Sequence, residues 1–293
     1  MIDHSSRRAR PVAGARAPAM DSLRVPELFG VRGKNVLVTG GARGIGLMIA
    51  SGFVANGADV YIASRDAAAC DDVATKLTAS GPGTCVALGS ADLSTEEGCA
   101  ALARAFREKT DAGALHVLVN NSGTSWGAPM RAHGEKGWDK TYDLNVKGVF
   151  FLTRELLPAL DAGSREDDPA RVINVGSTAG LRPQVFPTFS YDASKAAAHH
   201  LTKKLADELA DRRAEGGASI TVNAIAPGYV PSRMSQQLAT YEEAKDVLKG
   251  GIPLRRRGNE KDMAGAALYL ASAAGAWVTG VVLPVDGGFL AKL

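Results

Sequence analysis

The stretch NVLVTGGARGIG, residues 35–46, connects a short run of β-branched residues to the start of a helical pattern through a glycine-rich turn. Glycine is needed where a chain turns sharply and where backbone N–H groups must approach a pyrophosphate with no side chain between them. A glycine-rich turn alone is common, but this one follows a strand and precedes a helix, which is the setting of a dinucleotide-binding loop. The stretch therefore predicts a dinucleotide site. The residues that we expect in it are Thr39, Gly40, Gly44, Ile45 and Gly46.

The same alternation of strand and helix continues to the end of the chain. Further strands are predicted at 59–64, 85–89, 116–120, 171–175, 219–225 and 280–285. Helical spacing of apolar residues occurs at 45–56, 67–79, 95–109, 141–160, 191–213 and 261–273. Strands that are apolar throughout and separated by helices indicate a parallel sheet covered on both sides. We therefore expect an α/β fold: one doubly wound (Rossmann) domain of about seven parallel strands with helices on both faces.

The composition excludes several classes of protein. The 293 residues are 45% hydrophobic, which is enough for one packed core, but no apolar run approaches the roughly 20 residues that span a bilayer. Three cysteines with no close spacing argue against disulfides and thiolate metal sites. We expect a cytoplasmic protein that binds neither membrane nor metal.

The net charge of +3 comes from the first 19 residues, which carry four arginines and one aspartate. The rest of the chain is neutral overall, so no nucleic-acid surface is expected. Residues 1–19 are poor in acids and interrupted by prolines, and we expect a disordered extension there. It is interpreted as an upstream start before Met20, with an organelle import signal as the alternative. The domain itself is expected over 20–293.

The end of the second predicted strand favours one of the two nicotinamide dinucleotides. An NAD site usually has an acid there for the ribose 2′-hydroxyl, whereas this chain has Ser64 and then Arg65. A guanidinium suits a 2′-phosphate because it is a planar, permanently charged donor, and Arg43 in the glycine turn could reach the same group. We therefore expect NADP(H). Asp66, next to Arg65, leaves NAD(H) open as the alternative.

Two more strand ends carry candidate contacts. The sequence ADLS places Asp92 and Leu93 after the third strand, where the adenine would lie, and NNSG places Asn121 and Gly123 after the fourth. Ligands of such sheets bind beyond the carboxyl ends of the strands.

Tyr191 and Lys195, in SYDASK, lie one helical turn apart and share a face. Such a pair is often an unremarkable surface feature. Its alternative is acid–base chemistry, because a phenol has a pKa of about 10 and a nearby ammonium favours its ionised form. We therefore expect Lys195 to lower the pKa of Tyr191.

The order of these motifs resembles the short-chain dehydrogenase/reductase family. The matching stretches are TGxxxGxG at 39–46, NNxG at 120–123, Asn145 in LNVKG, Ser177 in NVGSTAG, Tyr191 and Lys195, PG at 227–228 and DGG at 286–288. Within the family, NNSGTSWGAP, VPSRM and IASRDAAAC resemble the branch of rhamnolipid-pathway 3-oxoacyl reductases and their fungal relatives.

The resemblance implies a role for each catalytic candidate. Tyr191 would be the proton donor, Lys195 would also hold the nicotinamide ribose, Ser177 would hydrogen-bond the substrate oxygen, and Asn145 would anchor a water in the proton relay. The family pattern also places a loop beside the nicotinamide. The residues of this loop are Pro227, Gly228, Val230 and Ser232, the last in place of a more usual threonine.

The expected activity is NADPH-dependent reduction of a ketone or 3-oxoacyl substrate to a secondary alcohol. The alternatives are alcohol oxidation by the same residues and a non-catalytic NADP-binding regulator. Residues 229–253 are interpreted as a substrate lid. The basic run 255–257 is interpreted as solvated, with a carrier phosphate as the other possibility. The resemblance also implies a homodimer or homotetramer that uses the helices near 141–160 and 191–213.

Overall fold

A computed structural model describes residues 20–110, 113–212, 216–232, 234–235 and 251–292. In this part of the chain, seven strands form one sheet in the order β3-β2-β1-β4-β5-β6-β7, and every neighbouring pair is parallel. The strands are β1 (Asn35–Thr39), β2 (Asp59–Ser64), β3 (Thr84–Ser90), β4 (Val117–Asn120), β5 (Ala170–Val175), β6 (Ile220–Pro227) and β7 (Val282–Val285). The predicted fold class is confirmed.

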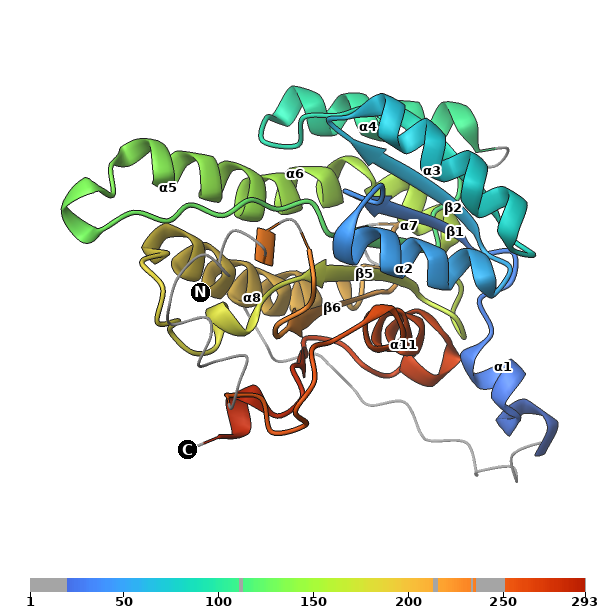
Figure 1. The fold of residues 1–293 in the computed structure, drawn as a ribbon. Coiled ribbons are helices and arrows are strands. Elements are labelled where there is room, and N and C mark those ends of the chain that lie inside the picture. Colours follow the sequence, from blue (N-terminus) through green and yellow to red (C-terminus); the bar gives the residue numbers. More distant parts are fainter. Residues whose placement is uncertain (1–19, 111–112, 213–215, 233, 236–250, 293) are drawn as a thin grey trace, which may run out of the picture.

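Helices cover both faces of the sheet (Figure 1). One face is packed by α2 and α11, which lie side by side, and the other by α4, α6 and α8. The bounds are α1 (Val25–Phe29), α2 (Gly44–Ala55), α3 (Ala67–Ser80), α4 (Glu96–Lys109), α5 (Glu135–Tyr142), α6 (Gly148–Glu155), α7 (Leu157–Gly163), α8 (Phe189–Leu209) and α11 (Glu260–Ala271). The expected extension at 1–19 lies outside the described residues, as do residue 233 and residues 236–250 of the expected lid.

Strand residues alternate between two apolar cores. In β1, Val36 and Val38 join the core under α2 and α11, whereas Leu37 joins the core under α4 and α6. The register pairs Leu37 with Leu118 of β4, which also points to the second core. All these side chains are fully buried, so each strand reads as continuously apolar.

The predicted helix at 141–160 is wrong in one respect, because it is not continuous. A π-helical turn, Asp143–Lys147 (η3), separates α5 from α6, and Leu156 leaves helical geometry before α7 begins at Leu157. Apolar spacing does not reveal a π turn, which inserts one residue into the helix without changing residue types. The predicted strand at 280–285 is also shorter, because it begins at Val282.

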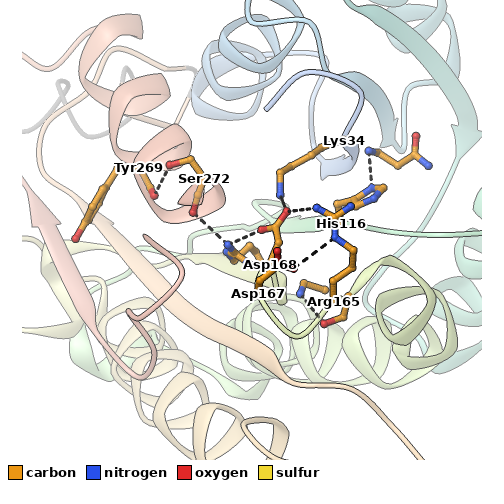
Figure 2. Close-up of polar contacts among 11 residues, drawn as sticks. Lys34, His116, Arg165, Asp167, Asp168, Tyr269 and Ser272 are labelled. Atoms are coloured by element: carbon orange, nitrogen blue, oxygen red, sulfur yellow. Dashed lines mark hydrogen bonds and ion pairs between the residues drawn. The ribbon is translucent and has the colours of Figure 1, made fainter. Parts of the chain in front are cut away.

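A charged cluster links the amino ends of the strands (Figure 2). Asp168, just before β5, accepts a hydrogen bond from Lys34 Nζ at 2.5 Å and from Arg171 Nη2 at 2.9 Å. Arg171 is fully buried and also donates to the Ser272 carbonyl oxygen after α11 at 3.1 Å. Its Nε and Nη1 have no partner among the described residues. Asp168 therefore supplies the carboxylate that balances a buried guanidinium.

Burial alone would raise the pKa of Asp168, but the hydrogen bond and charge of Lys34 and the charge of Arg171 outweigh it and lower the pKa. A carboxyl whose pKa is lower in the folded than in the unfolded state stabilises the fold above the unfolded pKa. That contribution is lost as the pH falls through the folded pKa.

We predict that Asp168→Asn lowers the free energy of unfolding by about 3 kcal/mol at pH 7, because it leaves Arg171 buried without its carboxylate. Urea unfolding followed by circular dichroism measures this loss. The difference from wild type should shrink as the pH falls below about 4, where an aspartate loses its charge. Asp167→Asn is the matched control, since the Asp167 side chain is exposed and its Oδ1 lies 3.7 Å from Arg165 Nε, which is too far for a strong hydrogen bond. Equal losses in the two variants would contradict the prediction.

Candidate active site

The glycine turn after β1 is shaped for close approach of a ligand. Gly40 and Gly44 have positive φ angles of 65° and 54°. A Cβ at Gly46 would lie 2.3 Å from the Gly40 carbonyl oxygen and 2.4 Å from Asn121 Nδ2, so no side chain fits there. Arg43, the N-cap residue of α2, makes no side-chain hydrogen bond to the first helical turn. The first N–H groups of α2 are therefore available to an anion such as a pyrophosphate.

Thr39 ties this turn to the end of β4. Its Oγ1 accepts hydrogen bonds from the backbone N–H groups of Asn121 at 3.0 Å and Ser122 at 2.9 Å. Asn121 Nδ2 donates in return to the Thr39 carbonyl oxygen at 2.7 Å. The strand order reverses between β1 and β4, which is where doubly wound sheets bind their ligands.

A cavity of about 350 Å³ runs from the glycine turn to α8. It brings together most of the residues predicted to bind the dinucleotide: Gly40, Arg43, Gly44, Ile45, Ser64, Arg65, Asp92, Leu93, Asn121, Gly123, Tyr191, Lys195 and Ser232. Thr39 and Gly46 are buried beneath the turn rather than on the wall. The shape and donor set of this cavity fit a dinucleotide.

The cavity wall includes Ser64, Arg43 and Arg65 but not Asp66. Asp66 is instead the N-cap of α3, where its Oδ1 accepts a hydrogen bond from the Ala69 N–H at 3.1 Å. Asp66 was the reason to keep NAD(H) as an alternative, and its carboxylate is instead engaged in capping α3. Arg43 and Arg65 remain on this part of the wall, where the 2′-phosphate that distinguishes NADP from NAD is expected.

Asn145 lies in the π turn and is buried. Its Nδ2 donates to the Thr124 carbonyl oxygen and to Ser194 Oγ, both at 2.9 Å, and its Oδ1 accepts from the Thr124 N–H. Both amide protons are used, so only the second lone pair of Oδ1 is open to a further donor. A Cβ at Gly123 would lie 3.3 Å from Asn145 Oδ1 and 3.5 Å from Lys195 Nζ. The glycine thus keeps a small space between these two groups.

Lys195 and Tyr191 project from one face of α8. Lys195 Nζ donates to the Val175 carbonyl oxygen, at the end of β5, at 2.8 Å and lies 5.9 Å from the centre of the Tyr191 ring. Burial lowers the pKa of Lys195 to about 8. The amine is therefore still mostly charged at neutral pH, and one of its N–H groups is used by the Val175 carbonyl oxygen.

The sequence predicted that Lys195 lowers the pKa of Tyr191, and this direction is wrong, because the pKa of Tyr191 is raised. Burial raises the pKa of Tyr191, a hydrogen bond with Ser177 opposes the rise, and the Asp192 charge adds to it. Lys195 is not among the causes. The sequence showed the spacing of the pair but not the depth of burial, which disfavours the phenolate.

A second cavity of about 320 Å³ adjoins the first and has mostly apolar walls. It includes Ser177, Pro227, Gly228 and Val230, whereas Ile45, Gly176, Tyr191, Ser232 and Met234 border both cavities. Tyr191 therefore lies where the two meet. Ser177 Oγ accepts a hydrogen bond from the Ala179 N–H at 3.1 Å, so its own O–H is left to donate toward Tyr191, with which Ser177 is hydrogen-bonded, or toward a ligand.

His199 is a site residue that the sequence did not reveal. It is buried one turn beyond Lys195, and its Nε2 accepts the backbone N–H of Ser177 at 3.4 Å. A Cβ at Gly176 would lie 2.0 Å from His199 Nε2, and one at Gly180 would lie 2.8 Å from Cε1. The pKa of His199 is lowered to about 4, first by burial and then by the Lys195 charge, so the ring is neutral. The four-residue spacing from Tyr191 to Lys195 to His199 was its one sequence signal.

The described residues contain no group of three or more histidine, cysteine, aspartate or glutamate side chains placed to hold a metal ion. Nor do they include a helix with both the length and the apolar character to cross a bilayer.

A nucleotide cavity that meets an apolar cavity at a buried tyrosine defines a dinucleotide-dependent oxidoreductase. The chain belongs to the short chain dehydrogenase family, whose model matches residues 34–243. The enzyme class acts on CH–OH and C=O groups.

Individual relatives are similar over almost their whole length. A rhamnolipids biosynthesis 3-oxoacyl-[acyl-carrier-protein] reductase of Pseudomonas aeruginosa is 46% identical over 261 residues, covering 89% of this chain and 98% of the relative. A gluconate 5-dehydrogenase of Gluconobacter oxydans is 33% identical, covering 92% and 99%. The solved Pseudomonas aeruginosa RhlG/NADP active-site complex superposes with a TM-score of 0.81 at 45% identity, covering 89% of this chain and 98% of that one.

We predict that His199 positions Ser177. His199→Phe keeps an aromatic ring but removes the acceptor, and it should lower kcat roughly tenfold, which corresponds to about one lost hydrogen bond. His199→Gln restores an acceptor and should recover part of the rate. NADPH affinity, followed by fluorescence titration, should not change.

The control is a double-mutant cycle with Ser177→Ala. If His199 acts through Ser177, replacing it by phenylalanine costs little more once the serine hydroxyl is gone. An equal additional loss in the Ser177→Ala background would assign His199 a general packing role instead.

Proposed function

We propose that the chain reduces a ketone of 3-oxoacyl or related type to a secondary alcohol with NADPH. The observation that carries the proposal is the position of Tyr191, on the wall of both cavities with Ser177 in one and Lys195 in the other. The bound dinucleotide would supply hydride to carbon, and the protein must supply the proton to oxygen.

The side chains suit the reductive direction. Because burial raises the pKa of Tyr191, the phenol is in its acid form at neutral pH, which is the form that a proton donor needs. Ser177, whose O–H is not used by the backbone, would hydrogen-bond the substrate oxygen. After proton donation, the Lys195 ammonium would stabilise the phenolate.

Asn145 and Gly123 support a route for returning the proton to Tyr191. The position that a Cβ of residue 123 would take is bordered by Asn145 Oδ1 at 3.3 Å and Lys195 Nζ at 3.5 Å. A water there could accept from Lys195 and donate to the open lone pair of Asn145. Gly123 would then be needed because a methyl group would fill the position of the water.

The preference for NADP(H) is proposed from Arg43 and Arg65, and from the use of Asp66 as a helix cap. The RhlG structure, at 45% identity, is a complex with NADP. A 2′-phosphate would be held by the guanidinium groups of Arg43 and Arg65, and the Asp66 carboxylate would not compete for them because it caps α3.

The proposed assembly is a homodimer or homotetramer. Its support is the family resemblance together with large apolar side chains at the surface: Trp277 is 99% exposed, and Phe150 of α6 is 40% exposed. A monomeric mass by light scattering at micromolar concentration would contradict it. We place the enzyme in the cytoplasm because its three cysteines are free.

We predict that Tyr191→Phe lowers kcat by at least about a hundredfold, because it removes the proton donor and keeps the ring. The measurement is single-turnover NADPH oxidation with a panel of ketones that includes a 3-oxoacyl thioester. NADPH binding, measured separately, should stay within about threefold of wild type. Undiminished turnover by the Tyr191→Phe variant with NADPH bound would refute the mechanism. Absence of hydride transfer in wild type with every ketone would favour a regulator.

We predict that Arg65→Gln raises the Kd for NADPH roughly tenfold and leaves that for NADH nearly unchanged, because a charged hydrogen bond to the 2′-phosphate is lost. Fluorescence titration with both dinucleotides gives the ratio. Asp66→Asn is the matched control and should not change the ratio, since the amide oxygen can still cap α3. Tighter binding of NADH than NADPH by wild type would overturn the cofactor assignment.

A further inference from the structure

The apolar cavity next to Ser177 has charge of one sign on its wall. Its apolar side chains include Val185, Phe186, Ile252 and Phe289. The charged residues on its described wall are Arg182 and Lys292, and no aspartate or glutamate is among them. A neutral apolar ketone would not need a cation there.

Arg182 is held in place from two sides. Its Nη1 donates to the Lys292 carbonyl oxygen at 3.1 Å, and its guanidinium lies 5.6 Å from the centre of the Phe289 ring. Neither contact neutralises its charge, and no carboxylate of the described residues is paired with it. The carboxyl-terminal segment therefore orients a guanidinium whose remaining N–H groups can meet a ligand.

The place of Arg182 in the chain connects it to the chemistry. It follows Ser177 by five residues, directly after the short helix Thr178–Gly180 (η4), and precedes α8, which carries Tyr191. The residue that would hold the reacting oxygen and the residue that carries the charge thus line the same cavity. A substrate with its carbonyl at Ser177 and Tyr191 would extend along apolar walls toward a cation.

We propose that this cavity takes a ketone whose apolar body ends in an anion, and that Arg182 is the residue that selects it. The inference rests on the proposed function and names its substrate class. Arg182 is exposed, so it stands at the open side of the cavity. A guanidinium pairs with a carboxylate or a phosphate through charge-assisted hydrogen bonds. The anion has two chemical sources: the carboxylate of an oxo acid at the end of the chain far from its ketone, or a phosphate at the end of the pantetheine arm of a coenzyme A or carrier-protein thioester.

The test compares anionic and neutral forms of one acyl chain. One pair is a medium-chain keto acid and its methyl ester, and the other is a 3-oxoacyl coenzyme A thioester and its N-acetylcysteamine thioester, which lacks phosphate. Steady-state NADPH oxidation is followed with wild type, Arg182→Gln and Arg182→Lys. The surface variant Arg104→Gln, on α4, controls for loss of a positive charge elsewhere.

For wild type we expect kcat/KM to be at least about tenfold higher for the anionic member of one pair. Preference for the keto acid identifies a carboxylate, and preference for the coenzyme A thioester identifies a phosphate. Arg182→Gln should remove the preference by raising KM of the anionic substrate with kcat retained, and Arg182→Lys should keep part of it. Added salt should raise KM of the anionic substrate alone in wild type, which tests the proposal without any variant.

Two results would overturn the proposal: equal kcat/KM for both members of each pair in wild type, or equal losses for charged and neutral substrates in Arg182→Gln. A failure of the proposed function is distinguishable, because wild type would then bind NADPH yet oxidise it with none of the four substrates.

Discussion

The contact between α8 and the end of β5 is the constraint on which the site depends. Lys195 Nζ reaches the Val175 carbonyl oxygen, and His199 Nε2 reaches the Ser177 N–H, one turn further along the same helix face. Gly176 and Gly180 make this approach possible, because a side chain at either would collide with His199. The helix is thereby docked in one register, and that register puts Tyr191 beside Ser177. The closeness of Tyr191, Lys195 and Ser177 is therefore a consequence of how α8 packs against the end of β5.

At the opposite end of the strands, the structure is held by charged hydrogen bonds rather than by close packing. Asp168 holds Lys34 before β1 and Arg171 in β5, and Arg171 reaches Ser272 after α11. These bonds join the amino ends of two strands to the carboxyl end of a covering helix (Figure 2). The candidate active site lies at the other end of the strands, beyond their carboxyl ends. A parallel sheet divides the two tasks in this way because all its strands point in one direction. The cluster of Lys34, Asp168 and Arg171 can therefore stabilise the fold from the amino ends of the strands, away from the candidate active site.

The fold was readable from sequence because its strands are buried on both faces and its helices are amphipathic, so each strand appears as a short apolar run. The glycine turn was readable because close approach requires glycine itself. The features that the sequence did not predict depend on contacts between segments that are far apart in the chain. Burial sets the pKa of Tyr191, the π turn places Asn145, and His199 matters through the backbone of Ser177. The roles assigned to the site residues remain predictions.

The two pKa shifts on α8 act together on the direction of the reaction. Burial raises the pKa of Tyr191 and lowers that of Lys195 to about 8, so each group is driven toward its neutral form. Neutral phenol is the reactant form for ketone reduction, whereas alcohol oxidation must begin from the phenolate. In the proposed mechanism, the Lys195 ammonium on the same face of α8 would stabilise the phenolate that proton donation leaves on Tyr191. For the proposed reduction, burial would therefore keep the Tyr191 phenol protonated before the reaction, and the charged Lys195 would offset the cost of burial once the phenolate has formed.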